Sequence, residues 1–449
     1  MDVSGPALAQ LPPGPSWPGI VQLGAWLLRP FDLMLHLRER YGTPVTMKFP
    51  QWPAIVAFDD PEANKEIFRG SSDDLYAGQA NQPLGPIVGR NSLLLLDGAR
   101  HLRERKLLLP PFHGERMTRY GEVMRDVARD DLATWPLDTP FAVQPHTQAV
   151  TLDIILRTVF GVETGAKQDA LRDALYHLIR DFSSPGLMVS WTQRDLGPRS
   201  PWGRYVRTRD RTDALIYGEI DARRADPRPG EDIFSMLLEA RHEDGEPMSR
   251  EELRDELVTM LVAGHETTAT ALSWAFHHLI EHPSVQRRVQ EELDRVMGDD
   301  PIDPGRSGEL VYLDAVVKET LRVIPVIAAV GRVTQRPTTI AGIDLPAGVL
   351  ASPSIFLTHM NPKIYPRPER FEPERFLDWK PTPYEWFPFG GGVRRCIGMA
   401  FALYEMRMVV ATVLQRHRVR RAPGASHRPV RRSVTMAPAA GTPIVVSQR

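Results

Sequence analysis

The spacing of hydrophobic positions along the chain predicts a mainly helical protein with small β-sheets. From about residue 61 to about residue 300, apolar residues recur mostly at helical spacing. Two short apolar runs at 45–49 and 54–58 are separated by Pro-Gln-Trp-Pro, which predicts a β-hairpin. A second β-rich patch at 338–357 contains two glycines as turn points. We therefore expect an α+β fold in which helices dominate.

The longest predicted helix begins after Ser249. Glu252 follows three residues later, which is the spacing of a capping box. Apolar residues continue to Ile280, and Pro283 lies just beyond. About 32 residues at 1.5 Å each would make a helix of roughly 48 Å, long enough to cross the centre of the molecule. A final helix is expected over residues 397–415.

Composition and charge narrow the class of protein. The chain has 449 residues, a net charge of −1 and ordinary hydrophobic content, so nothing draws it to nucleic acid or to anionic lipid. The first ten residues do not form a secretory signal, and no apolar run reaches the roughly 20 residues of a membrane span. No repeat or clear linker divides the chain. We expect a soluble, cytoplasmic monomer with one catalytic domain over 1–449, in which 1–19 form an extended lead-in rich in proline and glycine.

The centre of the long helix carries residues that helix stability alone would not select. It reads AGHETT, from Ala263 to Thr268. Ala263 and Gly264 leave one face without bulk, so that a large ligand could approach the backbone. Thr267 can bond the carbonyl of Ala263, and Glu266 places an acid beside that hydroxyl. Either this is a polar notch for moving protons, or Gly264 serves close helix packing and Glu266 is solvated. His265 is interpreted as packing or surface, not as a ligand.

The chain contains a single cysteine, Cys396, within FPFGGGVRRCIGMA. One cysteine excludes a disulfide within the chain and any cluster held by four cysteines. Three glycines before it can adopt positive φ and could let the backbone approach a flat group. Neighbouring Arg394 and Arg395 and a helix start would favour a thiolate. These residues alone leave two possibilities: a buried structural cysteine, or a nucleophile whose histidine base comes from elsewhere.

The cysteine segment resembles the haem-binding signature of the cytochrome P-450 family. Its fixed positions FxxGxRxCxG are met by Phe389, Gly392, Arg394, Cys396 and Gly398. Further segments resemble other motifs of that family and occur in the same order. AGHETT resembles the oxygen-activation motif, and Glu319-Thr-Leu-Arg322 resembles the ExxR motif. Residues 371–376 resemble the arginine-bearing segment that pairs with the ExxR motif. Residues 97–105 resemble the helix that holds a haem propionate. The resemblance spans residues 11–446 and implies the cytochrome P-450 fold with haem b, iron protoporphyrin IX, between the central and final helices.

The resemblance implies a role for each matched residue. Cys396 would be the iron ligand, and backbone N–H groups near Ile397 and Gly398 would moderate its charge. The propionates would be held by His101, Arg105, Arg332 and Arg394, and Ala263, Gly264 and Phe389 would also contact the cofactor. Glu266 and Thr267 would supply protons during oxygen activation. Glu319, Arg322 and Arg375 would form a buried network supporting the cysteine loop. One departure is His359-Met360, where many relatives have Arg-Asp.

The substrate pocket is predicted from segments that match the family's substrate-contact regions. They are residues 85–88, 183–188, 326–330 and a late turn at 435–438. The candidate lining residues are Ile87, Val88, Met260, Val326, Ile327 and Met436. These side chains are uncharged, so a medium-sized apolar substrate is expected. A terpenoid or steroid-like molecule is favoured, with a fatty-acyl or polyketide substrate as alternatives.

The sequence shows no dinucleotide fingerprint and no cluster cysteines, so electrons must come from separate proteins. The resemblance implies a ferredoxin and a ferredoxin reductase, and Arg100, Arg103 and Lys106 could form a basic docking face. The seven arginines of 416–432 are interpreted as a solvated face. The expected reaction is hydroxylation or epoxidation with O₂. A peroxide-driven or isomerising haem enzyme and a non-catalytic haem binder are the alternatives.

Overall fold

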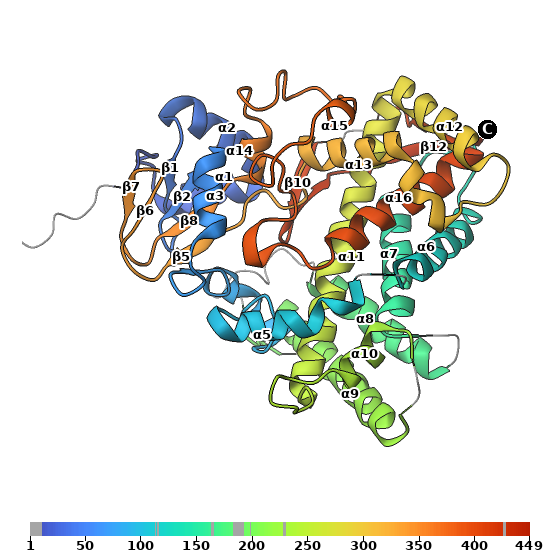
Figure 1. The fold of residues 1–449 in the computed structure, drawn as a ribbon, viewed down its shortest axis with the longest axis horizontal. Coiled ribbons are helices and arrows are strands. Elements are labelled where there is room, and N and C mark those ends of the chain that lie inside the picture. Colours follow the sequence, from blue (N-terminus) through green and yellow to red (C-terminus); the bar gives the residue numbers. More distant parts are fainter. Residues whose placement is uncertain are drawn as a thin grey trace, which may run out of the picture.

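The computed structural model describes residues 11–112, 114, 116–162, 166–182, 193–197, 199–227, 230–424 and 428–449. Helices dominate these ranges, as the apolar spacing predicts (Figure 1). In chain order, the α-helices are α1 (Gly19–Leu28), α2 (Pro30–Tyr41), α3 (Pro61–Arg69), α4 (Gly85–Val88), α5 (Gly98–Leu108), α6 (Arg116–Leu132), α7 (Gln144–Thr158), α8 (Ala166–Phe182), α9 (Pro201–Ala225), α10 (Ile233–Glu239), α11 (Arg250–Glu281), α12 (Pro283–Met297), α13 (Val311–Val323), α14 (Ile355–His359), α15 (Arg375–Asp378) and α16 (Met399–Arg416).

Short strands form small sheets. The strands are β1 (Val45–Met47), β2 (Ile55–Phe58), β3 (Leu75–Tyr76), β4 (Phe141–Ala142), β5 (Arg332–Thr334), β6 (Thr338–Ile340), β7 (Ile343–Leu345), β8 (Leu350–Pro353), β9 (His417–Arg421), β10 (Pro429–Arg432), β11 (Thr435–Pro438) and β12 (Pro443–Gln448). The largest sheet has the order β1-β2-β8-β5-β3. The predicted hairpin is confirmed, because β1 and β2 pair antiparallel with Val45 opposite Ala57.

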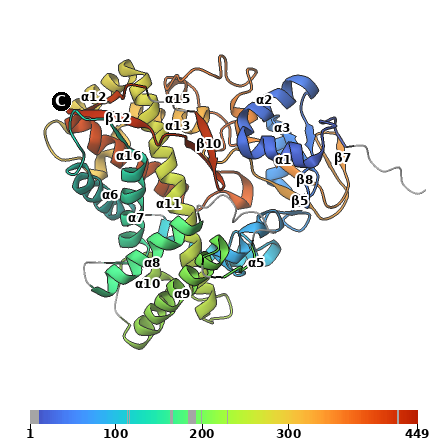
Figure 2. The ribbon, with the colours of Figure 1, turned by 180° about the vertical axis from the view of Figure 1, so that it is seen from behind.

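The long helix α11 runs through the middle of the molecule (Figure 1). Its capping box is confirmed: the Ser249 hydroxyl accepts the Glu252 N–H at 3.1 Å, and Glu252 Oε2 accepts the Ser249 N–H at 2.8 Å. The helix has 32 residues, as the sequence predicts. Seen from behind, α6, α7 and α16 again lie on one side of α11, and the β-rich part with α1, α2 and α3 lies on the other (Figure 2). Within the described part of the chain, no helix is long and apolar enough to cross a membrane.

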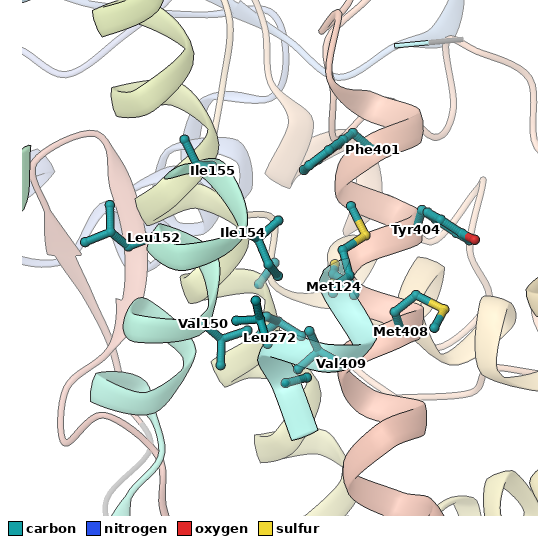
Figure 3. Packing of buried hydrophobic residues seen from close by; sticks show 14 of the residues in the cluster. Met124, Val150, Leu152, Ile154, Ile155, Leu272, Phe401, Tyr404, Met408 and Val409 are labelled. Carbon is teal, nitrogen blue, oxygen red and sulfur yellow. The ribbon is translucent and has the colours of Figure 1, made fainter. Parts of the chain in front are cut away.

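The main core fills the space between α6, α7, α11 and α16. Met124, Ile154, Leu272 and Val409 meet there from these four helices, and each is buried (Figure 3). The core fixes the final helix against the long one. The segment that contains Cys396 leads directly into α16, which begins at Met399, so the packing of this helix also positions the cysteine.

Two local expectations are wrong. The β-rich patch ends at Pro353, because the Ser354 hydroxyl accepts the Leu357 N–H at 3.1 Å and caps α14. Residues 435–438 form strand β11, not a turn, since they pair with β10. The extended lead-in holds over residues 11–18, where Pro13 C=O accepts the Thr46 N–H at 2.9 Å.

Candidate functional site

The loop before α16 folds back on itself around Cys396. The Cys396 N–H donates to Phe389 C=O at 3.0 Å, and the Gly390 N–H donates to Phe387 C=O at 2.9 Å. Gly390 and Gly392 have φ of +68° and +63°, which only glycine adopts readily. The backbone thus reverses within a few residues, and Cys396 lies at the entry to the helix.

Two of the glycines are required for packing against α3. A Cβ added at Gly391 would lie 2.4 Å from the Phe68 ring, and one at Gly392 would lie 2.0 Å from Phe68 C=O. Both glycines are therefore required by the close approach of α3, and their predicted role toward a flat group stays a prediction. Gly398 is different, because a Cβ there would meet nothing within 4 Å.

The Cys396 side chain is exposed, although protein atoms surround its base. Desolvation by these atoms raises the pKa of Cys396, while the Gly398 N–H and the charges of Arg105 and Arg395 oppose that rise. A thiolate here has one backbone donor and two positive neighbours. A structural cysteine would normally be buried, so the structural interpretation of Cys396 is disfavoured.

Four basic side chains gather beside this loop from three parts of the chain. His101 and Arg105 come from α5, Arg332 from β5, and Arg394 from the short 3₁₀ helix η5 (Gly392–Arg394). Burial, followed by the charges of Arg394, Arg105 and Arg332, lowers the pKa of His101 to about 3. Burial lowers the pKa of Arg332 and of Arg394 to about 10, and the neighbouring arginine adds to this in each case. The structure therefore brings together all four predicted propionate ligands.

These cations have few anionic partners in the described part of the chain. Arg394 pairs with Asp97 at 2.6 Å and donates to the carbonyls of Leu93 and Leu96. Arg332 donates to the carbonyls of Gly331 at 2.9 Å and Gly391 at 3.4 Å, and Arg105 to that of Arg395 at 2.6 Å. His101 Nδ1 is buried without a hydrogen-bond partner. Since buried charge requires compensation, the group fits a ligand that carries carboxylates.

The centre of α11 adopts the predicted local bond. Thr267 Oγ1 donates to Ala263 C=O at 2.5 Å. Glu266 Oε2 accepts from Gln148 Nε2 at 2.9 Å. Desolvation raises the pKa of Glu266, against the opposing effects of Gln148 and Arg432. Glu266 is thus held within the fold, not solvated as the alternative reading had it, and is disposed to carry a proton at higher pH than an ordinary glutamate.

The two small residues of this centre differ. Ala263 is exposed, whereas a Cβ at Gly264 would lie 3.0 Å from Ile155 Cδ1 on α7. Packing of α11 against α7 therefore explains Gly264, and its contact with a cofactor stays a prediction. His265 is buried, with Nε2 3.0 Å from Gln148 C=O, so its interpretation as a packing residue agrees with the structure.

Glu319 and Arg322 form a fully buried ion pair on α13. Arg322 Nε donates to Glu319 Oε2 at 2.7 Å, and Arg322 Nη2 donates to Glu319 Oε1 at 2.8 Å. Arg375 Nε lies 3.5 Å from Glu319 Oε1, and the Glu372 N–H donates to the same oxygen at 2.8 Å. The network predicted from the ExxR resemblance is therefore assembled. It ties α13 to the irregular segment that precedes the cysteine loop.

Comparison with known proteins decides the family. Residues 12–442 match the family model for cytochrome P450. The chain belongs to the cytochrome P450 family. It is 39% identical over 446 residues to a protein of Mycobacterium tuberculosis provisionally named cytochrome P450 135B1, covering 99% of this chain and 93% of that protein.

Two further relatives agree. A second M. tuberculosis protein, provisionally named cytochrome P450 137, is 36% identical over 411 residues, which cover 91% of this chain and 84% of that protein. The retinoic acid-bound structure of a cyanobacterial P450, CYP120A1, superposes with a TM-score of 0.86 at 26% identity and covers 98% of this chain and all of that chain. The protein is therefore a haem b-binding monooxygenase with the P450 fold.

In this P450, His359 occupies the position at which many relatives have an arginine. Its side chain is fully buried, and Nε2 accepts the Phe387 N–H at 3.2 Å. Its backbone carbonyl accepts from Arg322 Nη1 at 3.0 Å. Burial, with the charge of Arg322 adding to it, lowers the pKa of His359 to about 3, so the ring is a neutral acceptor. His359 thereby links the buried ion pair to the start of the cysteine loop.

The predicted pocket residues are distributed over several clusters. Ile87, Val88 and Val326 belong to the main core cluster, with Met260 packed against it. Ile327 packs against the cluster of Phe68 and Phe387. Met436 lies among Phe31, Met34 and Phe356. The segment at 183–188 lies outside the described residues, and all six assignments stay predictions.

The arginine-rich segment is not a uniformly solvated face. Arg431 lies with its guanidinium 5.1 Å from the centre of the Trp26 ring, and burial lowers its pKa to about 10. Arg432 is close enough to Glu266 to lower that residue's pKa. Arg431 and Arg432 are both half-buried, not fully exposed.

Two functional contacts were missed in the sequence. His359 was noted only as a departure, and Phe68 was not considered. The sequence did offer a signal for His359, because it lies shortly before the segment that pairs with the ExxR motif. A buried helix end in that region needs hydrogen-bond donors and acceptors, which a histidine can supply. Nothing in the sequence joins Phe68 to Gly392, because they are more than 300 residues apart.

Proposed function

We propose that this P450 hydroxylates or epoxidises a medium-sized apolar substrate of the terpenoid or steroid-like class, with Cys396 as the iron ligand. The observation that carries the residue assignment is the juxtaposition of Cys396 with the four basic side chains. Arg105, on the same helix as His101, donates to the Arg395 C=O at 2.6 Å, one residue before Cys396. This proximity supports the assignment of a thiolate ligand beside propionate partners.

Haem b, when bound, activates dioxygen and accepts electrons for that purpose. Cys396 would supply the thiolate that donates electron density to the iron. The Gly398 N–H stabilises the sulfur as an anion, and Arg105 and Arg395 add positive charge nearby. Together they would keep Cys396 deprotonated while it serves as a ligand.

The four basic groups would orient the cofactor through its carboxylates. Arg332 is nearly fully buried and has only backbone carbonyls as hydrogen-bond acceptors among the contacts described. His101 offers an unpaired Nδ1. Carboxylates placed there would raise the pKa of His101, because they would offset the three arginine charges that lower it.

Glu266 and Thr267 would hold and move protons. Glu266 Oε2 is fixed by Gln148, and its raised pKa lets the carboxyl retain a proton nearer to neutral pH. Thr267 Oγ1, held by the Ala263 carbonyl, has lone pairs with which to accept a hydrogen bond from water or substrate. A proton could pass between these groups through water.

The substrate class rests on the apolar character of the predicted pocket. Ile87, Val88, Met260, Val326 and Ile327 come from α4, α11 and the segment after α13, and all are uncharged. The cyanobacterial structure that resembles this chain holds retinoic acid. An isoprenoid of that size agrees with such a lining.

Electrons would come from a separate ferredoxin and ferredoxin reductase. Arg100 and Lys106 on α5 are exposed, and Lys106 pairs with Glu243 at 2.8 Å. Arg103 lies within 3.3 Å of Glu104. Arg395, beside Cys396, is also exposed, so basic side chains lie close to the cysteine loop and could meet an acidic partner.

The test combines binding with turnover. A library of terpenoids, steroids and fatty acids is screened for the spectral change that accompanies displacement of water from the iron. Each hit is then incubated with O₂, NAD(P)H, a ferredoxin and its reductase, and products are identified by mass spectrometry. We expect isoprenoid hits that gain one oxygen atom. Binding and oxygenation confined to fatty acids would overturn the substrate class.

A further inference from the structure

A compact group of one histidine and two glutamates lies apart from the cysteine loop. Glu104 belongs to α5, His242 to the loop between α10 and α11, and Glu252 to the first turns of α11. One ligand atom from each lies within 4.8 Å of the others. In Figure 1, α5 lies beside the lower part of α11, where that helix begins. The group therefore joins three segments that are distant in the sequence.

The side chains of this group are withdrawn from solvent. The exposed fractions of the side chains are 1% for Glu104, 8% for His242 and 16% for Glu252. His242 is held by a tight turn, in which its N–H donates to Glu246 C=O at 2.8 Å and its C=O accepts the Gly245 N–H at 2.9 Å. The imidazole, on a fixed turn, thus faces one buried carboxylate, that of Glu104, and one half-buried carboxylate, that of Glu252.

The imidazole has no ordinary hydrogen bond to either carboxylate. Its Nδ1 is 3.9 Å from Glu104 Oε1, and its Nε2 is 3.6 Å from Glu252 Oε2. Hydrogen bonds of this kind measure about 2.7–3.2 Å. Nδ1 is buried without a partner. One ion can be bound by only one nitrogen of the ring, and a single ligand atom from each of the three residues lies within 4.8 Å of the others, which leaves room for one ion at about 2.0–2.2 Å from its ligands.

The carboxylates of this group have few cationic partners among the described residues. Arg103, 43% exposed, contacts Glu104 at 3.3 Å. Glu104 and Glu252 otherwise face the imidazole of His242. A cation between them would compensate their charge.

We propose that Glu104, His242 and Glu252 bind one divalent ion of the first transition series. One imidazole nitrogen and two carboxylate oxygens form a ligand set that suits zinc or its neighbours. The Glu252 carboxylate is already oriented for metal binding, because its Oε2 accepts the Ser249 N–H at 2.8 Å. The ion would fasten the α10–α11 loop to α5, the helix that also carries His101 and Arg105. This site is separate from the proposed function and does not depend on it.

The experiment uses the haem-loaded protein, freed of loosely bound metal with a chelator and titrated with Zn²⁺ alone. Calorimetry and elemental analysis after desalting give the affinity and stoichiometry, and thermal unfolding gives stability. We expect one equivalent of zinc and a rise in unfolding temperature with zinc concentration. His242→Ala and Glu104→Gln should each weaken zinc binding on the order of 100-fold, since loss of even an outer-sphere partner costs about 10–100-fold.

His177→Asn is the matched control. His177 Nε2 also approaches a carboxylate, Asp173 Oδ1 at 3.2 Å, but on the surface of α8. This variant should bind zinc like the parent protein. Absence of zinc binding by the parent protein would overturn the proposal, as would zinc binding that both variants retain. A stability gain at low pH that requires His242, without zinc binding, would show a protonated imidazole in place of a metal and would also overturn it.

Discussion

Removal of the Glu319 carboxylate should strip this P450 of its haem. In Glu319→Ala, the Arg322 guanidinium keeps its acceptors at His359, Pro368 and Arg370 but loses the two bonds to its counter-ion. Both side chains have no exposed surface, so water cannot replace the lost partner. The Glu372 N–H loses its acceptor as well.

The size of the effect follows from these contacts. Two charge-assisted bonds at about 1.5–3 kcal/mol each suggest a loss of roughly 3–6 kcal/mol. Breaking a buried ion pair by removing one partner costs about 3–5 kcal/mol, which agrees. The free energy of unfolding of a domain is about 5–15 kcal/mol, so the expected loss is a large part of the total. The loss falls on the segment that leads to Cys396.

The assay measures haem per protein and the free energy of unfolding in denaturant. Glu309→Ala is the matched control, because Arg306 holds Glu309 in the same two-bond geometry at 2.9 Å on an exposed surface. We expect little or no haem in Glu319→Ala and parental values in Glu309→Ala. Parental haem content and stability in Glu319→Ala would refute the reasoning.

Three further predictions concern the central helix and the cysteine loop. Thr267→Ala should still bind haem and substrate but release more hydrogen peroxide per NAD(P)H consumed, because the hydroxyl held by the Ala263 carbonyl is lost. Unchanged coupling of NAD(P)H consumption to product formation would contradict the role of Thr267. His359 has a folded-state pKa of about 3 against 6.5 when unfolded, so its contribution to stability is complete above pH 6.5 and is lost as the pH falls toward 3. The loss should be about 1.4 kcal/mol per pH unit. His359→Asn should therefore show a shallower fall in unfolding free energy between pH 6 and pH 4, and parallel curves would argue against a buried neutral ring. Gly392→Ala should reduce the yield of folded, haem-loaded protein, because its Cβ would meet Phe68 C=O at 2.0 Å and φ is +63°. Gly308→Ala should leave the yield unchanged, because its Cβ would enter open space. Equal yields from the two variants would exclude the packing argument.

The sequence was most informative where structure is decided locally. The capping box of Ser249 and Glu252 predicted the start of α11, because both partners lie within one turn. The pairing of β1 with β2 followed from a short turn between two apolar runs. The buried network expected from the ExxR resemblance is present, since Glu319 and Arg322 pair at 2.7 Å with no exposed surface.

The sequence was least informative where distant segments meet. The contact of Gly391 and Gly392 with Phe68 on α3 was not foreseen, because only their role toward a flat group was predicted. Arg431 was assigned to a solvated face, yet its guanidinium lies against the ring of Trp26. The role of His359 depends on the Phe387 N–H, which the fold brings to it. In each case the partner is far away in the chain, and no local pattern identifies it.

The central claim, that Cys396 binds the haem iron as a thiolate, is tested most directly by the absorption spectrum of the reduced, carbon monoxide-bound protein. Cys396 is the only cysteine in the 449 residues, so no other side chain of the chain can supply a thiolate. We expect a main band shifted strongly to the red in the parent protein and no such shift in haem-loaded Cys396→Ser. An unshifted band in folded, haem-loaded parent protein would contradict the assignment.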